Sequence, residues 1–241
     1  MSRLTRQEIL KEDKFLTTLE WARDFFLRNR KQLLMGLGGL GLLLLTLAGI
    51  RYYLAQRDET AKDELSQALK IYHASVLGAT PAFAPSGTSE PSFATPTEKF
   101  AKALTEFQKV SARHSSHAAG KIARYYAGLS LRELNRASEA IAILEPLSRE
   151  KSDVGVLAQG ALGAIYESTG NLPKAAEAYQ QIAQSDSVVV PKNESLMHLA
   201  QLYEQQGKTA EATKIYQQVV KDFPGTSYVG EAEQKLKQLA H

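Results

Sequence analysis

Residues 162–179, LGAIYESTGNLPKAAEAY, have the same layout as residues 199–216, LAQLYEQQGKTAEATKIY. In both segments a Leu and a small residue are followed by a Tyr, then a Gly, an Ala and a second Tyr. The offsets are identical, and the segments lie 37 residues apart. A fixed internal period of this length is typical of repeat architectures. We therefore expect these residues to form two copies of one structural unit.

The same offsets recur further upstream. Thirty-five residues before the first segment, the matching positions hold Gly128, Leu131, Asn135, Ala140 and Leu144. Asn135 replaces the Gly between the two halves of the unit, a position where a left-handed backbone tolerates Asn. Another 37 residues back, the second half of a fourth unit is matched by Ala103, Phe107 and Val110.

These spacings predict pairs of helices stacked as an all-α solenoid. The small residues are expected where paired helices cross closely, the tyrosines between neighbouring helices, and Gly170 and Gly207 at the end of the first helix of a pair. Residues 227–240 are expected to form a capping helix that turns Val229, Ala232, Leu236 and Leu239 inward. The pattern resembles the tetratricopeptide repeat (TPR). It departs from that repeat at the usual early Trp, where Arg124, Gln159 and Leu196 stand.

The first unit of the predicted TPR domain, residues 58–241, is interrupted. Residues 58–77 have the apolar spacing of its first helix. Residues 78–97 then hold four of the eight prolines, seven Ser or Thr and no Lys or Arg. This composition predicts a disordered insertion between the two helices of the unit.

A membrane anchor is predicted before the repeats. Residues 33–50, LLMGLGGLGLLLLTLAGI, contain no charge, and as a helix they would span about 27 Å. Arg51, Tyr52 and Tyr53 follow at the depth of a membrane interface, so we expect a transmembrane helix over 33–53. A cleaved signal peptide is the alternative, although the preceding 32 residues are long for a leader.

Charge sets the expected orientation of the anchor. Arg28, Arg30 and Lys31 lie close to its N-terminal side, against Arg51 alone on the other side. The positive-inside rule then places residues 1–32 in the cytoplasm and the repeats across the membrane. Residues 4–31 have amphipathic helical spacing, which suits either a helix in the membrane interface or one that continues the span.

Motifs for chemistry are missing from the sequence. It has no Cys, no H-E-x-x-H, no G-x-S-x-G and no phosphate-binding loop. The G-x-G-x-x-G of residues 36–41 lies inside the apolar run, without the strand that a dinucleotide site needs. His114 and His117 share a helix-facing spacing but have no carboxylate nearby in the sequence. We therefore expect no enzyme activity, cofactor, metal or small-molecule substrate.

The net charge of +3, concentrated before residue 58, does not indicate nucleic-acid binding.

A protein-binding surface remains as the functional expectation. In a TPR solenoid the first helix of each unit lines the inner face, and the offsets place nine residues there: Tyr125, Leu129, Arg132, Leu157, Ala164, Glu167, Met197, Gln201 and Glu204. They lack the Lys and Asn of TPR modules that bind a C-terminal carboxylate. An apolar lining suits an extended hydrophobic segment or a partner helix. The alternative is that Tyr125, Leu129 and Leu157 only pack beneath the first unit. Glu167, Glu204 and Glu211 are expected on solvated helix faces.

The order of segments resembles one family in particular. A short tail with Ala22-Arg23-Asp24-Phe25-Phe26, one membrane helix, a charged helix and then TPR units are similar to the ancillary SecYEG translocon subunits (YfgM-like). The resemblance implies a bacterial inner-membrane protein with a periplasmic TPR domain. Its implied partners are the translocon and a membrane-anchored periplasmic chaperone. Residues 223–228, FPGTSY, are also similar to TPR scaffolds of outer-membrane assembly and cell-division coordination, which is the alternative role.

Overall fold

The computed structural model describes residues 58–77 and 91–240, together with positions 23, 27–28, 44–47, 49–51 and 56. The chain divides into two units, Met1–Arg57 and Asp58–His241. Most of the predicted tail at 1–32 and of the predicted span at 33–53 lies outside the described residues, as do residues 78–90 of the predicted insertion. In the first unit, the described positions are helical. Among the residues that the structure describes, no helix is long and apolar enough to cross a membrane.

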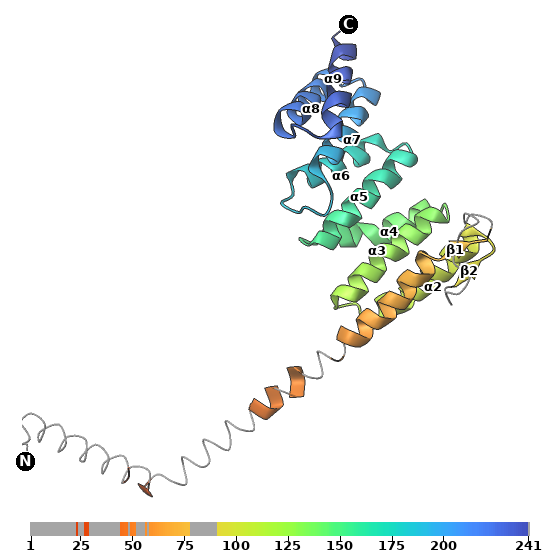
Figure 1. Ribbon diagram of the computed structural model, residues 1–241, viewed down its shortest axis with the longest axis vertical. Coiled ribbons are helices and arrows are strands. Elements are labelled where there is room, and N and C mark those ends of the chain that lie inside the picture. Colours follow the sequence, from red (N-terminus) through yellow and green to blue (C-terminus); the bar gives the residue numbers. More distant parts are fainter. Residues whose placement is uncertain are drawn as a thin grey trace, which may run out of the picture. The chain divides into compact units, whose positions relative to one another are not determined.

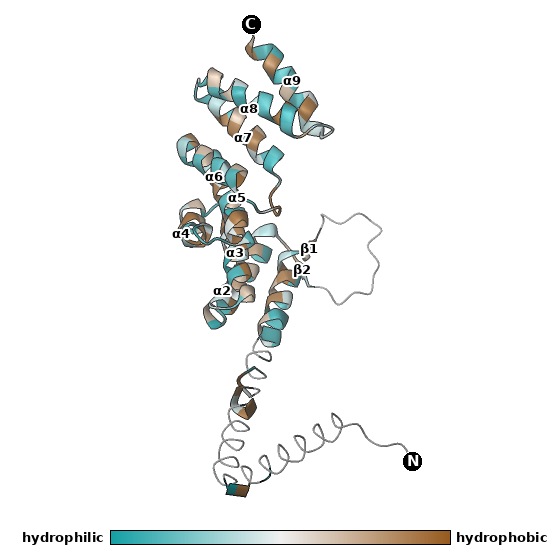
Figure 2. Cartoon of the chain, turned by 90° about the vertical axis from the view of Figure 1, so that its left-hand side faces the viewer, coloured by the Kyte–Doolittle hydropathy of each residue, from teal (hydrophilic) through white to brown (hydrophobic). Residues whose placement is uncertain are grey.

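The second unit is built from helices that follow one another in chain order (Figure 1). Residues 58–72 form the first helix. The remaining helices are α2 (Pro96–Arg113), α3 (Ala118–Glu133), α4 (Ala137–Ser148), α5 (Asp153–Ser168), α6 (Leu172–Gln184), α7 (Lys192–Gln205), α8 (Thr209–Asp222) and α9 (Ser227–Leu239). They form four helix pairs and a final helix, which confirms the predicted all-α TPR-like solenoid for this unit. Each helix carries both apolar and polar residues (Figure 2), so each can bury one face and solvate the other.

The turns between paired helices repeat one hydrogen-bonded form. Asn135, Gly170 and Gly207 have positive φ angles of 58°, 76° and 72°. In each turn the next residue donates its N–H to a carbonyl five residues earlier, at 2.8 Å in all three cases. This left-handed closure satisfies the last carbonyls of the first helix and reverses the chain. The prediction of Asn135 in a glycine position is confirmed.

The first helix pair is joined differently. The short strands β1 (Ser75–Val76) and β2 (Ser92–Phe93) pair in parallel, and the N–H of Leu77 donates to the carbonyl of Phe93 at 2.9 Å. Helix α2 then starts at Pro96, where the Thr95 side chain accepts from the N–H of Glu98. The predicted disordered insertion over 78–97 therefore extends too far, because residues 91–97 form a strand and a capped helix start.

The core depends on close contact between the two helices of a pair. A methyl group added at Gly128 would lie 2.6 Å from the Leu144 side chain, and one at Gly163 would lie 2.9 Å from the Tyr179 ring. Leu144 is fully buried and Tyr179 is 5% exposed, so neither side chain has free space to move into. The prediction that small residues mark these crossings is confirmed.

The buried residues form two clusters that meet at α7. One cluster extends from the first helix to α7, and the other joins α7, α8 and α9. In α9, Ala232 is fully buried and Leu236 and Leu239 pack against the second cluster, as predicted. Val229 is not part of that cluster; Tyr228, one residue earlier, packs there instead. The capping helix therefore has a slightly different buried face from the one expected.

Gly128→Ala should destabilise the repeat domain. The added methyl group overpacks a crossing that cannot open, at a cost of about 1–3 kcal/mol, which outweighs the gain of up to about 1 kcal/mol in helix propensity. Urea unfolding of the full chain measures the change. Gly230→Ala in α9 is the matched control, since its Cβ would have nothing within 4 Å and the substitution should be neutral or stabilising. Equal stability of the two variants would contradict the close-crossing argument.

Candidate protein-binding surface

The first helices of the pairs (58–72, α3, α5 and α7) form what we call the inner face. A cavity of about 540 Å³, which we call the inner cavity, lies between α3, α5 and α7 on this face. It is lined by six of the nine residues predicted for the groove: Tyr125, Leu129, Arg132, Leu157, Ala164 and Glu167. The spacing of the repeat thus located residues that are far apart in the sequence and adjacent in the structure.

One part of the inner cavity is apolar. Leu129 is only 9% exposed, while Tyr125, Leu157 and Ala164 are half-buried and remain accessible from the cavity. Burial raises the pKa of the Tyr125 hydroxyl, as expected for a phenol in an apolar setting. Leu129 belongs to the first core cluster and Tyr125 packs against it, while both also line the open space of the cavity.

Sequence reasoning missed Val190. This residue lines the inner cavity from the connection between α6 and α7, where its side chain lies 3.8 Å from the position of a Cβ on Gly160. The only indication in the sequence was the 37-residue length of the period, which requires extra residues such as 187–190 in a connection. The period does not show that this connection reaches the cavity. Val188 and Val189 of the same connection are 91% and 38% exposed.

The other part of the inner cavity is polar. Glu167 of α5 accepts a hydrogen bond from the Tyr179 hydroxyl at 3.2 Å. The His198 ring stacks on Tyr179, with centroids 4.8 Å apart, and its Nδ1 lies 3.6 Å from a Glu167 oxygen. Glu194 lines the cavity from the first turn of α7. Neither Glu194 nor His198 was identified from the sequence, because the repeat offsets assigned Met197, Gln201 and Glu204 of this helix to the inner face instead.

The last three predicted groove residues do not reach the inner cavity. Met197 is 2% exposed in the second core cluster. The Gln201 amide donates to Glu231 of α9 at 3.0 Å, and Glu204 accepts from Lys235 of α9 at 3.0 Å. Helix α9 therefore engages the inner face of the last unit. As a result, the candidate surface ends at the beginning of α7.

Three tyrosine hydroxyls are bonded to glutamates within the stack. Tyr216 donates to Glu204 at 2.6 Å, Tyr179 donates to Glu167, and Tyr166 donates to Glu145 at 2.7 Å. The prediction that Glu167 and Glu204 lie on solvated faces is wrong, since both are partly buried acceptors. Helical periodicity places a residue on a face but does not show that a hydroxyl from the partner helix reaches it.

Two histidines acquire carboxylate neighbours only through the fold. The Nε2 of His114 lies 3.2 Å from Glu64, and the Nε2 of His117 lies 3.4 Å from Asp58, both on the first helix. His114 and His117 have no carboxylate close to them in the sequence, but the fold places one beside each of them. Across the described part of the chain, no group of three or more His, Asp or Glu side chains is arranged to hold a metal ion.

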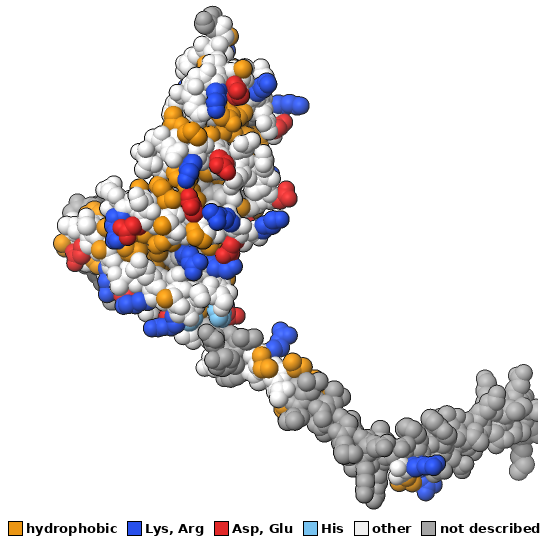
Figure 3. Space-filling view, turned by 180° about the vertical axis from the view of Figure 1, so that it is seen from behind, with side chains coloured by type: hydrophobic (Ala, Val, Ile, Leu, Met, Phe, Trp, Pro, Cys, Tyr) orange, Lys and Arg blue, Asp and Glu red, His pale blue; other side chains and the backbone are white. Residues whose placement is uncertain are grey.

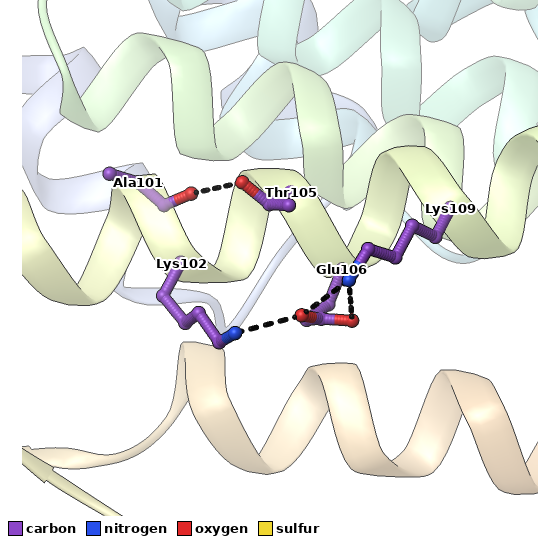
Figure 4. A network of polar contacts seen from close by, with 5 residues as sticks. All are labelled: Ala101, Lys102, Thr105, Glu106 and Lys109. Carbon is purple, nitrogen blue, oxygen red and sulfur yellow. Dashed lines mark hydrogen bonds and ion pairs between the residues drawn. The ribbon is translucent and has the colours of Figure 1, made fainter.

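Other polar groups outside the inner face pair with each other. On α2, Glu106 bonds to Lys102 and Lys109, which lowers the pKa of its carboxyl group (Figure 4). A larger, polar cavity of about 1220 Å³ lies against α4, α5 and α6. Its Glu145 bonds to Tyr166 and pairs with Lys174. We assign these groups to stability, because their partners are already supplied by the chain.

The space-filling view shows hydrophobic side chains in patches between charged ones (Figure 3). Stacked helix pairs with such a mixed surface define the class of helical-repeat proteins. The sequence matches the tetratricopeptide repeat family at residues 97–153, 127–189 and 194–226, and the chain belongs to that family. These repeats imply a scaffold for protein–protein interaction.

Two solved structures share the fold. One is a crystal structure of nearly identical TPR-like repeats from Podosopora anserina, described as kinesin light chain; it is 14% identical, with a TM-score of 0.53, covering 76% of this chain and 86% of that one. The other is a variant of the same repeats, which is 15% identical, with a TM-score of 0.51 and coverages of 76% and 94%. At this identity the likeness concerns the fold alone. Comparison with curated proteins gives no match.

Stability of the repeat domain should fall between pH 10 and 12. Burial, aided by the bond to Glu145, raises the pKa of Tyr166 to about 12, while an unfolded tyrosine titrates near 10. The folded chain therefore keeps a proton that the unfolded chain loses, so the stabilisation is complete below pH 10 and is lost as the pH rises towards 12. Urea midpoints at pH 9, 10 and 11 should decrease less in Tyr166→Phe than in the unmodified chain. Tyr228→Phe is the control, and an identical pH slope in all three chains would contradict the assignment.

Proposed function

We propose that this protein is a non-catalytic adaptor that holds a protein partner at the inner cavity. The observation that carries the proposal is the accessible apolar lining formed by Tyr125, Leu157 and Ala164 between three stacked helices. Apolar side chains that line open space favour association with another protein. The surface is made by rigid helices rather than loops, which suits binding without a large loss of conformational entropy.

The proposal includes attachment to the bacterial inner membrane through residues 33–53. The uncharged 18-residue run and the flanking cations and tyrosines support it. So do the described side chains of this stretch, since Leu44, Leu45 and Leu47 are 57%, 72% and 49% exposed. In this arrangement residues 1–32 are cytoplasmic and the repeat domain is periplasmic.

The proposed partners are the SecYEG translocon and a membrane-anchored periplasmic chaperone. This choice is supported by the resemblance in the order of tail, span, charged helix and repeats. An anchor at the membrane surface would keep the inner cavity close to proteins that emerge from the translocon. The adaptor would then increase the effective concentration of chaperone at the exit site.

Blocking the inner cavity should remove partner contacts. Ala164→Trp places a large ring in the cavity, and crosslinking in cells followed by mass spectrometry should show a loss of about tenfold or more in translocon and chaperone peptides. The expected thermal stability is nearly unchanged, because Ala164 faces open space. Ala210→Trp, an exposed position on α8, is the matched control and should keep the crosslinks.

Two outcomes would contradict the proposal. Crosslinks that persist in Ala164→Trp would show that the inner cavity is not the binding surface. Recovery of division or outer-membrane assembly proteins, in place of translocon components, would favour the alternative scaffold role. Thermal unfolding of both variants separates a blocked surface from a damaged fold.

A topology reporter tests the compartment. Alkaline phosphatase fused after His241 is active only outside the cytoplasm, so we expect an active, membrane-bound fusion. A cytoplasm-active reporter such as β-galactosidase at the same position should be inactive. Reversed activities would place the repeats in the cytoplasm, and release of the active fusion into the soluble periplasm would favour the cleaved signal peptide.

A further inference from the structure

We propose that the inner cavity selects an extended peptide segment in which a large apolar side chain is followed by a Lys or Arg. This inference rests on the proposed function, since it specifies which chemistry the docking surface recognises. It is carried by the size of the cavity, by its apolar lining residues and by an excess of carboxylates in the same lining. Each of these restricts the partner independently.

The size of the cavity limits what enters it. At about 540 Å³, it lies within the usual range of about 300–1,000 Å³ for ligand pockets. A whole partner helix, about 10 Å across with its side chains, needs a longer groove. On the inner face such a groove is interrupted, because α9 engages Gln201 and Glu204 beyond the cavity. A few side chains of an extended segment therefore fit better than a helix.

The apolar lining residues set the first requirement. Tyr125 and Leu129 come from α3, and Leu157 and Ala164 from α5, so two adjacent helices present carbon surface to one space. Val190 adds a further apolar side chain to the lining from the connection before α7. Transfer of a Phe or Leu side chain from water to such a surface is favourable in proportion to the apolar area covered.

The charged lining residues set the second requirement. Glu167 and Glu194 are the carboxylates that line the cavity, and Arg132 is the cation. Arg132 is already paired, since its guanidinium bonds to the adjacent Glu133 at 2.7 Å. The partner of Glu167 is a neutral tyrosine hydroxyl, and Glu194 has no hydrogen bond or ion pair to any residue of the described ranges. The excess charge of the lining is therefore negative.

The two carboxylates act on the same space. Burial raises the pKa of Tyr179, and both Glu167 and Glu194 raise it further. Tyr179, Glu167 and Glu194 all line the same cavity, and the Tyr179 hydroxyl donates to Glu167 at 3.2 Å, so a cation bound beside Tyr179 would be attracted by both carboxylates. His198, stacked on Tyr179 and 3.6 Å from Glu167, is the remaining titratable group here.

Defined peptides test this selectivity on the full-length chain. Fluorescein-labelled GSGFLKGSG is compared with GSGFLEGSG, GSGFLQGSG and GSGSSKGSG by fluorescence anisotropy. We expect the Phe-Leu-Lys peptide to bind at least about tenfold more tightly than the Glu peptide, with the Gln peptide between them. Loss of the apolar pair in the last peptide should abolish measurable binding. Ala164→Trp should abolish the binding of the other three peptides.

A charge exchange makes the test specific. Glu194→Lys should invert the preference, so that the Phe-Leu-Glu peptide becomes the tighter ligand. Glu211→Lys is the matched control, because Glu211 also lies in the first turn of its helix and is exposed on α8, outside the cavity. The Glu211→Lys variant should prefer the Phe-Leu-Lys peptide, as the unmodified chain does. Both variants lose the same favourable helix-terminus charge, so a stability effect would appear in both.

The outcomes separate this inference from the proposed function. If Ala164→Trp removes the cellular crosslinks but the four peptides show no preference for Lys, the selectivity is wrong and the docking surface stands. The same conclusion follows if no peptide binds, or if Glu194→Lys does not invert the preference. If Ala164→Trp leaves both crosslinks and peptide binding intact, the inner cavity is not the site and both proposals fail.

Discussion

Close approach of the two helices in each pair is the constraint on which this structure depends. At Gly128 and Gly163, the absence of a side chain lets a Leu or Tyr from the partner helix lie almost against the backbone. The turn between the helices has to be short and left-handed to maintain this distance, and Asn135, Gly170 and Gly207 supply that geometry. Interior packing at this density leaves little space for adjustment. The spacing of the pair is therefore set by its smallest residues.

The open inner face follows from this packing. Because each pair is tightly closed, contact between neighbouring pairs is left to the larger side chains, and the first helices do not fill the space between α3, α5 and α7. The longer connection before α7 adds Val190 to this space and brings Glu194 and His198 to its edge. At the last unit, α9 occupies the equivalent position and bonds to Gln201 and Glu204. An accessible region between α3, α5 and α7 is the consequence.

The buried tyrosine–glutamate bonds connect packing with charge. Tyr179 and Tyr216 fill the space within their pairs, and each directs its hydroxyl to a glutamate 12 residues earlier. The upstream pair has Leu144 and Arg132 at the corresponding positions, so it packs without the bond. On the inner face of that pair the position is held by the cation Arg132. The next two helix pairs have the carboxylates Glu167 and Glu204 at the same position. This difference between repeats gives the inner cavity its uneven charge.

The amino-acid sequence alone determined the helix pairs, their order, the turn residues and six of the residues that line the cavity. It could do so because a helix repeats its contacts at fixed offsets, and the small residue, the Tyr and the turn Gly are each required by local geometry. The positions of Met197, Gln201 and Glu204 were decided only by the tertiary structure, since the docking of α9 has no counterpart in the repeat. The same is true of Val190, Glu194 and His198, and of the carboxylates beside His114 and His117. Contacts of this kind join segments whose separation in the chain follows no period, so only the folded packing brings them together.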